Sequence, residues 1–193
     1  MRDSAFAVAL GLLLALGALL APANVHARDA RFGYAAMQAK DDSYVLEADI
    51  HFEFNERLED AVQRGVALYL VLEVEITRDR WYWIDEEIVR RVRTYRLSYH
   101  PLTRSYRLTL GSLHQNFDSL EEALQPLRRV RGWTIIPRAR LKPGTSYDVS
   151  LRFQLDTSQL PKPFQVTALG SSDWTLETDW LQWTFLATAP AVP

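Results

Sequence analysis

Apolar and polar side chains alternate along three stretches of the chain, residues 44–54, 66–77 and 147–155. Successive side chains of a β-strand point to opposite faces of a sheet, so a period of two predicts three half-buried strands. The composition of residues 31–40 and 174–185 indicates two further strands.

The strand expected over residues 174–185 changes phase along its length. The early residues of its apolar face have even numbers: Trp174, Leu176, Thr178 and Trp180. The later residues have odd numbers: Leu181, Trp183 and Phe185. One extra residue would bring both groups to the same face of a sheet. The pattern therefore predicts a β-bulge near Trp180 and Leu181.

The segment TYRLSYHPLTRSYRLTL predicts a hairpin. Its connection runs from His100 to Ser105, and Pro101 fixes the backbone at the first corner. Arg104 should then project from the loop. Three cross-strand pairs would share one face: Tyr95 with Leu110, Leu97 with Leu108, and Tyr99 with Tyr106.

Two short helices interrupt the strands. NERLEDAVQRG begins with Asn55, a favoured N-cap residue, and ends at Gly65, which suits a left-handed C-terminal cap. SLEEALQPLRR begins with Ser119 and carries Glu122 three residues later, which is the capping-box spacing. Pro126 should end or kink this second helix. We expect only turn structure in SQLPKP.

Many short strands without regular alternation of strand and helix favour a mainly β fold. We expect an antiparallel β-sandwich of about seven to nine strands with two short helices, formed as one domain by residues 28–185. Residues 186–193 show no pattern, so we expect a disordered tail.

Residues 1–27 resemble a signal peptide. An apolar run of 17 residues, Ala5 to Ala21, is followed by Pro22 and by a small-residue cleavage site ending at Ala27. We therefore expect a periplasmic protein. The alternative is a chain tethered to the inner membrane by residues 5–21, its sole membrane contact, because 17 residues is the lower limit for spanning a bilayer.

The chain has no cysteine, which excludes disulfides, zinc–thiolate sites and a lipid-modified N-terminal cysteine. Charge is segregated: residues 41–77 hold 10 acidic and 2 basic side chains, and residues 78–140 hold 13 basic and 7 acidic ones. The basic middle could attract an anionic partner. The simpler interpretation is that acidic and basic strands lie side by side and pair.

Candidate catalytic residues are few. Beyond the signal segment the histidines are His51, His100 and His114, and none has the spacing of a metal site. No phosphate loop, nucleophile elbow or H-E-x-x-H motif occurs. We expect a non-catalytic protein without cofactor or metal. A hydrolase whose triad is assembled only by the fold is a third hypothesis, and it requires a cleft that brings a histidine, a serine and an acid together.

The segment RDRWYWIDEE carries the candidate binding residues Arg80, Trp81 and Trp83. If the preceding strand continued unbroken, both Trp rings would lie on the face of Glu73 and Glu75, which we expect to be solvent-exposed. Exposed indoles beside arginine would form a binding platform. The alternative is that a bulge or turn sends both rings into the core.

Several motifs together resemble a proteobacterial secreted family called domain of unknown function 4390. They are LSYHPLTRSYRL, RDRWYWIDEE, FDSLEEALQPL and LRFQLDTSQLPKPFQ, with the Trp-rich ending LQWTF. The resemblance covers residues 32–185 and implies a small exported protein. It also implies a genomic association, because members are often encoded beside a nitrogen-type membrane sensor kinase.

We therefore expect an exported, non-catalytic protein that binds an envelope or membrane protein, such as the outer part of a sensor kinase. Arg80, Trp81, Trp83 and Arg104 are its candidate binding surface. The alternative is a glycan- or peptidoglycan-binding module that uses exposed Trp rings. We expect no nucleic-acid partner, and the pattern does not indicate an oligomeric state.

Overall fold

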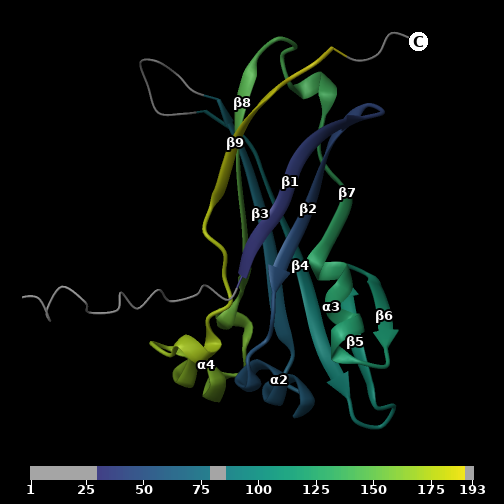
Figure 1. Ribbon diagram of the computed structural model, residues 1–193, viewed down its shortest axis with the longest axis vertical. Helices are drawn as coiled ribbons and strands as arrows, with labels where there is room; N and C mark the ends of the chain where they lie inside the picture. The colour runs from purple at the N-terminus through teal and green to yellow at the C-terminus, as the bar shows by residue number, and fades with distance from the viewer. Residues whose placement is uncertain (1–29, 79–85, 190–193) are drawn as a thin grey trace, which may run out of the picture.

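The computed structural model describes residues 30–78 and 86–189, and within them the chain forms two antiparallel sheets that face each other (Figure 1). The three-stranded sheet has the order β1-β2-β7: β1 (Ala30–Lys40), β2 (Ser43–Phe52) and β7 (Arg129–Pro137). The six-stranded sheet has the order β6-β5-β4-β3-β8-β9: β3 (Leu68–Arg78), β4 (Glu86–His100), β5 (Ser105–Leu110), β6 (Leu113–Phe117), β8 (Ser146–Leu155) and β9 (Leu181–Leu186). This arrangement confirms the mainly β sandwich predicted from the alternation.

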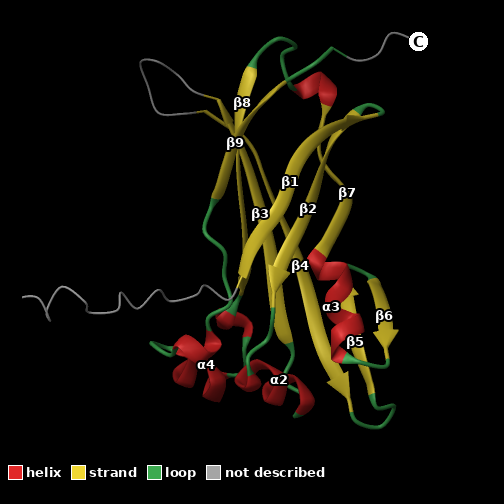
Figure 2. Cartoon of the chain, viewed as in Figure 1, coloured by secondary structure: helices red, strands yellow, loops and turns green. Residues whose placement is uncertain are grey.

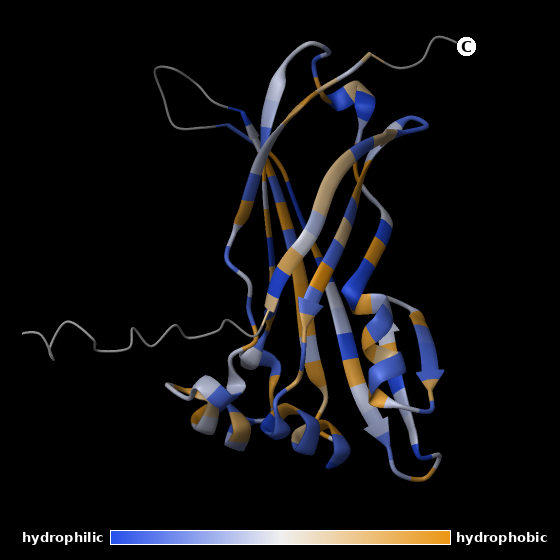
Figure 3. Cartoon of the chain, viewed as in Figure 1, coloured by the Kyte–Doolittle hydropathy of each residue, from blue (hydrophilic) through white to orange (hydrophobic). Residues whose placement is uncertain are grey.

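The core lies between the two sheets, where the inward positions of each strand meet. Figure 3 shows the alternation of apolar and polar residues along the central strands. Leu46 of β2, Leu72 of β3 and Phe153 of β8 are fully buried. The rings of Phe52 and Phe153 lie 5.0 Å apart and join the sheets directly. Because apolar burial drives folding, these inward rows fix which face of each strand is internal.

The β4–β5 hairpin has the predicted register. Tyr95 pairs with Leu110, Leu97 with Leu108, and Tyr99 with Tyr106, and the two tyrosine rings lie 4.9 Å apart. Arg104 has a φ of 50° at the end of the connecting turn. The hairpin therefore places Arg104 in the loop, as predicted, with a left-handed backbone.

Of the three α-helices in the described residues, two lie at one end of the sandwich and the other lies beside β5 and β6 (Figure 2). The Asn55 side chain caps α2 (Glu56–Gln63), and Ser119 caps α3 (Leu120–Arg128), both as predicted. Pro126 lies inside α3, which continues for two more residues. The third helix, α4 (Lys162–Ala168), falls where only a turn was expected. Its prolines precede it and occupy its first turn, and proline is well accommodated there.

The segment before β9 contains the predicted bulge. Glu177 pairs with Gln154, and Leu181 pairs with Leu151, so one extra residue lies between the two pairs. The expectation that Trp180 faces inward with Trp174, Leu176 and Thr178 is wrong, because the extra residue leaves Trp180 on the outer face of the sheet, where it is 37% exposed, while Leu181 points inward. The fold continues past Phe185: Ala187 is buried, and the backbone N–H of Thr188 donates to the Tyr44 hydroxyl at 2.8 Å.

Candidate binding surface

The first hollow, here called the apolar slot, opens where β1 begins and the chain approaches β9. It has a volume of about 450 Å³. Its lining is mostly apolar and consists of Ala30, Arg31, Phe32, Thr178, Asp179, Trp180 and Leu181. β1 and β9 are each the last strand of their sheet, so the slot lies at an open side of the sandwich.

The second hollow, here called the polar cleft, has a volume of about 870 Å³ and lies between the end of β2 and the helices α2 and α3. This volume is in the usual range for small-ligand sites. Buried side chains form its floor, and charged or amide side chains form its rim. Its lining consists of Arg31, His51, Phe52, Glu53, Phe54, Glu59, Gln63, Leu120, Glu121, Leu124 and Arg128.

The charged side chains of the polar cleft differ in whether they form ion pairs. Arg128 pairs with Glu121, donates from Nε to the Phe52 carbonyl at 3.2 Å, and lies 5.4 Å from the Phe52 ring centroid. Glu53, Glu59 and Arg31 make no ion pair with any residue that the structure describes. Because Arg31 lines both hollows, a cation without an ion pair to any described residue lies where the apolar slot meets the polar cleft.

Tyr106 of β5 lies beside α2, close to the polar cleft. Burial, and then the neighbouring Tyr99, raise the pKa of the Tyr106 phenol above its ordinary value, whereas a hydrogen bond with Gln63 lowers it. Glu59 raises this pKa slightly further. The phenol therefore stays protonated at neutral pH and serves as a hydrogen-bonding group beside the cleft.

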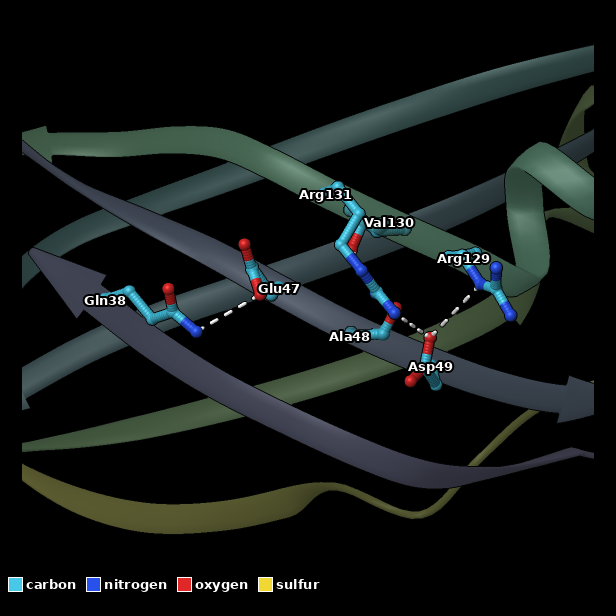
Figure 4. A network of polar contacts seen from close by, with 7 residues as sticks. All are labelled: Gln38, Glu47, Ala48, Asp49, Arg129, Val130 and Arg131. Carbon is cyan, nitrogen blue, oxygen red and sulfur yellow. Dashed lines mark hydrogen bonds and ion pairs between the residues drawn. The ribbon is translucent and has the colours of Figure 1, made fainter. Parts of the chain in front are cut away.

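Some acidic side chains of residues 41–77 form ion pairs across the sheet with basic side chains of residues 78–140. Asp49 of β2 pairs with Arg131 and, at 4.0 Å, with Arg129, both on β7, as Figure 4 shows. In the same view Gln38 donates to Glu47 at 3.1 Å. These groups are exposed or half-buried at the surface, so each pair contributes little to stability. They support the interpretation that acidic and basic strands lie side by side.

The outer face of the six-stranded sheet holds a buried carboxylate. Glu73 is only 5% exposed, because Arg90 and Arg152 lie against it from the neighbouring strands. The hydrogen bond with Glu73 raises the pKa of Arg90. The Arg152 guanidinium also stacks on Trp180, 4.7 Å from the ring centroid. The expectation that Glu73 faces solvent is therefore wrong, because two long arginine side chains cover it.

The sequence-predicted binding residues are only partly placed. Arg104 is exposed at the tip of the β4–β5 hairpin and lines neither hollow. Arg80, Trp81 and Trp83 lie outside the described residues, so that interpretation stays a prediction. The residues of both hollows were not identified from the sequence, because they come from separate elements. The one feature of the sequence that could have indicated the polar cleft is the group of acidic residues around Asn55.

The three histidines of the described residues lie on three different strands. His51 lies on the outer face of β2, His100 ends β4, and His114 is exposed on β6. The His51 ring lies so close to Gly33 that a Cβ there would be 2.3 Å from Nε2. Among the described residues, no group of three or more His, Cys, Asp or Glu side chains could hold a metal ion.

Comparison with known proteins gives one finding. A family model described as "Domain of unknown function (DUF4390)" matches residues 27–184. No curated protein and no solved structure matches the sequence. In the part of the chain that the structure describes, no helix is both long and apolar enough to cross a membrane.

Proposed function

Because the chain belongs to the DUF4390 family, whose description assigns no activity, we propose from its surface that it is a non-catalytic protein-binding module of the cell envelope. The partner is another envelope protein, and the outer region of a membrane sensor kinase is the first candidate. The apolar run of residues 5–21 and the small-residue site ending at Ala27 support export to the periplasm.

One observation carries the proposal: the apolar slot and the polar cleft share Arg31, which has no ion-pair partner among the described residues. Protein interfaces combine an apolar centre with a polar rim, and arginine and tryptophan are enriched among the residues that dominate their binding energy. Trp180 and Phe32 supply apolar surface on one side of Arg31. On the other side lie the carboxylates of Glu53 and Glu59, which form no ion pair within residues 30–78 and 86–189.

The test is quantitative capture of solubilised envelope proteins on the immobilised full chain, comparing wild type with Arg31→Glu. Reversing this charge should reduce the recovered partner about 10-fold or more, the usual scale for a central arginine. Arg57→Glu is the matched control, because Arg57 is exposed on α2 and lines neither hollow. It should retain wild-type capture. Recovery of the same protein by Arg31→Glu at wild-type yield would contradict the proposal.

A glycan- or peptidoglycan-binding module is the second candidate. It is supported by Trp180, which lines the apolar slot and is 37% exposed, since sugar rings stack on indole faces. Adding cell-wall fragments should then shift the intrinsic tryptophan fluorescence, and Trp180→Phe should abolish the shift. An unchanged spectrum across a broad panel of glycans would eliminate this candidate.

A further inference from the structure

Strand β1 is an unprotected sheet edge. It is the terminal strand of its sheet, and no described residue pairs with its outer side. Edge strands in soluble proteins are usually protected by charged residues or proline along their length. β1 carries charge only near its ends, at Arg31 and Lys40, and contains no proline. Its one protective feature is a bulge at Gly33, which leaves Tyr34 to Lys40 as a regular edge.

The register shows which backbone groups are free. Lys40 and Ser43 flank the two-residue turn and form a hydrogen-bonded pair. Hydrogen-bonded and non-hydrogen-bonded pairs then alternate along an antiparallel ladder. Counting back from Lys40, the N–H and C=O groups of Ala39, Met37 and Ala35 point away from β2. These groups form a row that only another extended backbone satisfies efficiently.

The apolar slot continues this edge. Ala30, Arg31 and Phe32 belong to β1 itself and line the slot, so a strand laid along β1 reaches it directly. Side chains of an added strand alternate between two sides, and those on the inner side would face Leu181 and the half-buried rings of β9. The slot would therefore select an apolar side chain at one end of the added strand.

We infer that the partner binds by β-strand addition: an extended, uncharged segment of another protein pairs with Ala35, Met37 and Ala39 and places one apolar side chain in the apolar slot. The inference rests on the proposed protein-binding function and names its mode. A second copy of the chain fits less well. Symmetric pairing about Met37 would bring the partner copy's β1–β2 turn opposite Phe32 and leave the slot unfilled.

The test selects 12-residue linear peptides from a displayed random library on the immobilised full chain. The selected peptides should show apolar residues at every second position. Ala39→Pro removes one outward N–H without removing a β1–β2 hydrogen bond, a position where edge strands tolerate proline. It should weaken peptide binding roughly 5-fold, the loss expected for one hydrogen bond of about 1 kcal/mol. Ala39→Val keeps the N–H and should bind within about 2-fold of wild type.

A second measurement covers the case in which Ala39→Pro perturbs the fold. In wild type, bound peptide should slow amide hydrogen exchange at Ala35, Met37 and Ala39 more than at Ala36 and Gln38, whose amides already bond to β2.

Peptides that bind without protecting the amides of Ala35, Met37 and Ala39, and equally well to Ala39→Pro, would overturn strand addition while leaving the protein-binding proposal intact. Failure to recover any binding peptide from the library would also overturn strand addition. The capture of envelope proteins on the immobilised chain would then test protein binding by itself. Dimerisation that Ala39→Pro abolishes would identify a second copy as the occupant and overturn the inference.

Discussion

At the scale of single residues, Glu73 shows how a carboxylate can be buried on the outer face of the six-stranded sheet. Its carboxylate is buried by Arg90 and Arg152, and Arg152 is in turn held by the Trp180 ring. A buried charge is tolerated when its partners are close and hydrogen-bonded. The contact joins β3, β4 and β8 and orients Trp180, which also lines the apolar slot.

Glu73→Ala should therefore lower the free energy of unfolding by about 1–3 kcal/mol, because the partly buried Arg152 loses its carboxylate. Urea unfolding measures this change. The matched control is Glu75→Ala, since Glu75 is more exposed than Glu73 in its own pair with Arg90, and its loss should cost less than about 1 kcal/mol. Equal costs for the two variants would show that the burial of Glu73 has no energetic consequence.

Tyr106 makes a pH-dependent contribution to the stability of the folded protein. Its raised pKa means that the folded protein holds the phenolic proton more tightly than the unfolded chain, whose tyrosines titrate near 10. The stability from this group is therefore fully present below about pH 10 and is lost as the pH rises through the folded-state pKa. In an ultraviolet titration of phenolate, Tyr106→Phe should remove a component that titrates above the ordinary tyrosine value. Loss of an ordinary component instead would contradict the assignment.

At the scale of elements, α2 links the polar cleft to the rest of the fold. Asn55 accepts from the Leu58 N–H at 3.0 Å and donates from Nδ2 to the Asp173 carbonyl, also at 3.0 Å. One side chain thus begins the helix and ties it to the segment before β9. Since Glu59 and Gln63 line the cleft from this helix, Asn55 also fixes the position of the cleft wall.

Asn55→Ala should cost about 1–2 kcal/mol of stability, because it removes both the cap and the tie to Asp173. Asn55→Ser keeps a cap acceptor and loses only the tie, so it should cost less. Thermal unfolding of the two variants measures the difference. If serine costs as much as alanine, the cap contributes nothing and the role of Asn55 is confined to its contact with Asp173.

The elements themselves were largely predictable from the sequence. A strand with one buried face must alternate, so β2, β3 and β8 are visible as a period of two, and cap residues mark α2 and α3. α4 was missed because the same prolines that favour a turn also begin a helix. The two hollows were not predictable, because β1, β9, α2 and α3 meet there only through tertiary packing.

At the scale of the whole molecule, the fold brings the edge strands β1 and β9 and the helices α2 and α3 around one surface. The apolar slot lies beside the edge strands, and the polar cleft lies beside the two helices, with Arg31 lining both. On the outer face of the smaller sheet, the charges of Asp49, Arg129 and Arg131 already pair with one another. The adjoining hollows are therefore the surface best suited to a partner.

Export is a property of the whole chain and has a direct test. If residues 1–27 are a cleaved signal peptide, intact-mass measurement of the chain recovered from the envelope fraction should show a protein that begins at Arg28. A retained N-terminus with membrane association would support tethering by residues 5–21 instead. Recovery of the full-length chain from the cytoplasmic fraction would contradict export.

Site-specific photo-cross-linking in living cells tests the central claim, that the surface around Arg31 binds another protein. A photoreactive residue in place of Glu53 at the polar cleft should give a discrete heavier adduct, and adding Arg31→Glu should abolish it. The same residue in place of Lys142 is the control, because Lys142 is exposed in the turn between β7 and β8 and lines neither hollow. We expect no adduct there. Adducts of equal yield from Glu53 and Lys142, or none from Glu53, would contradict the claim.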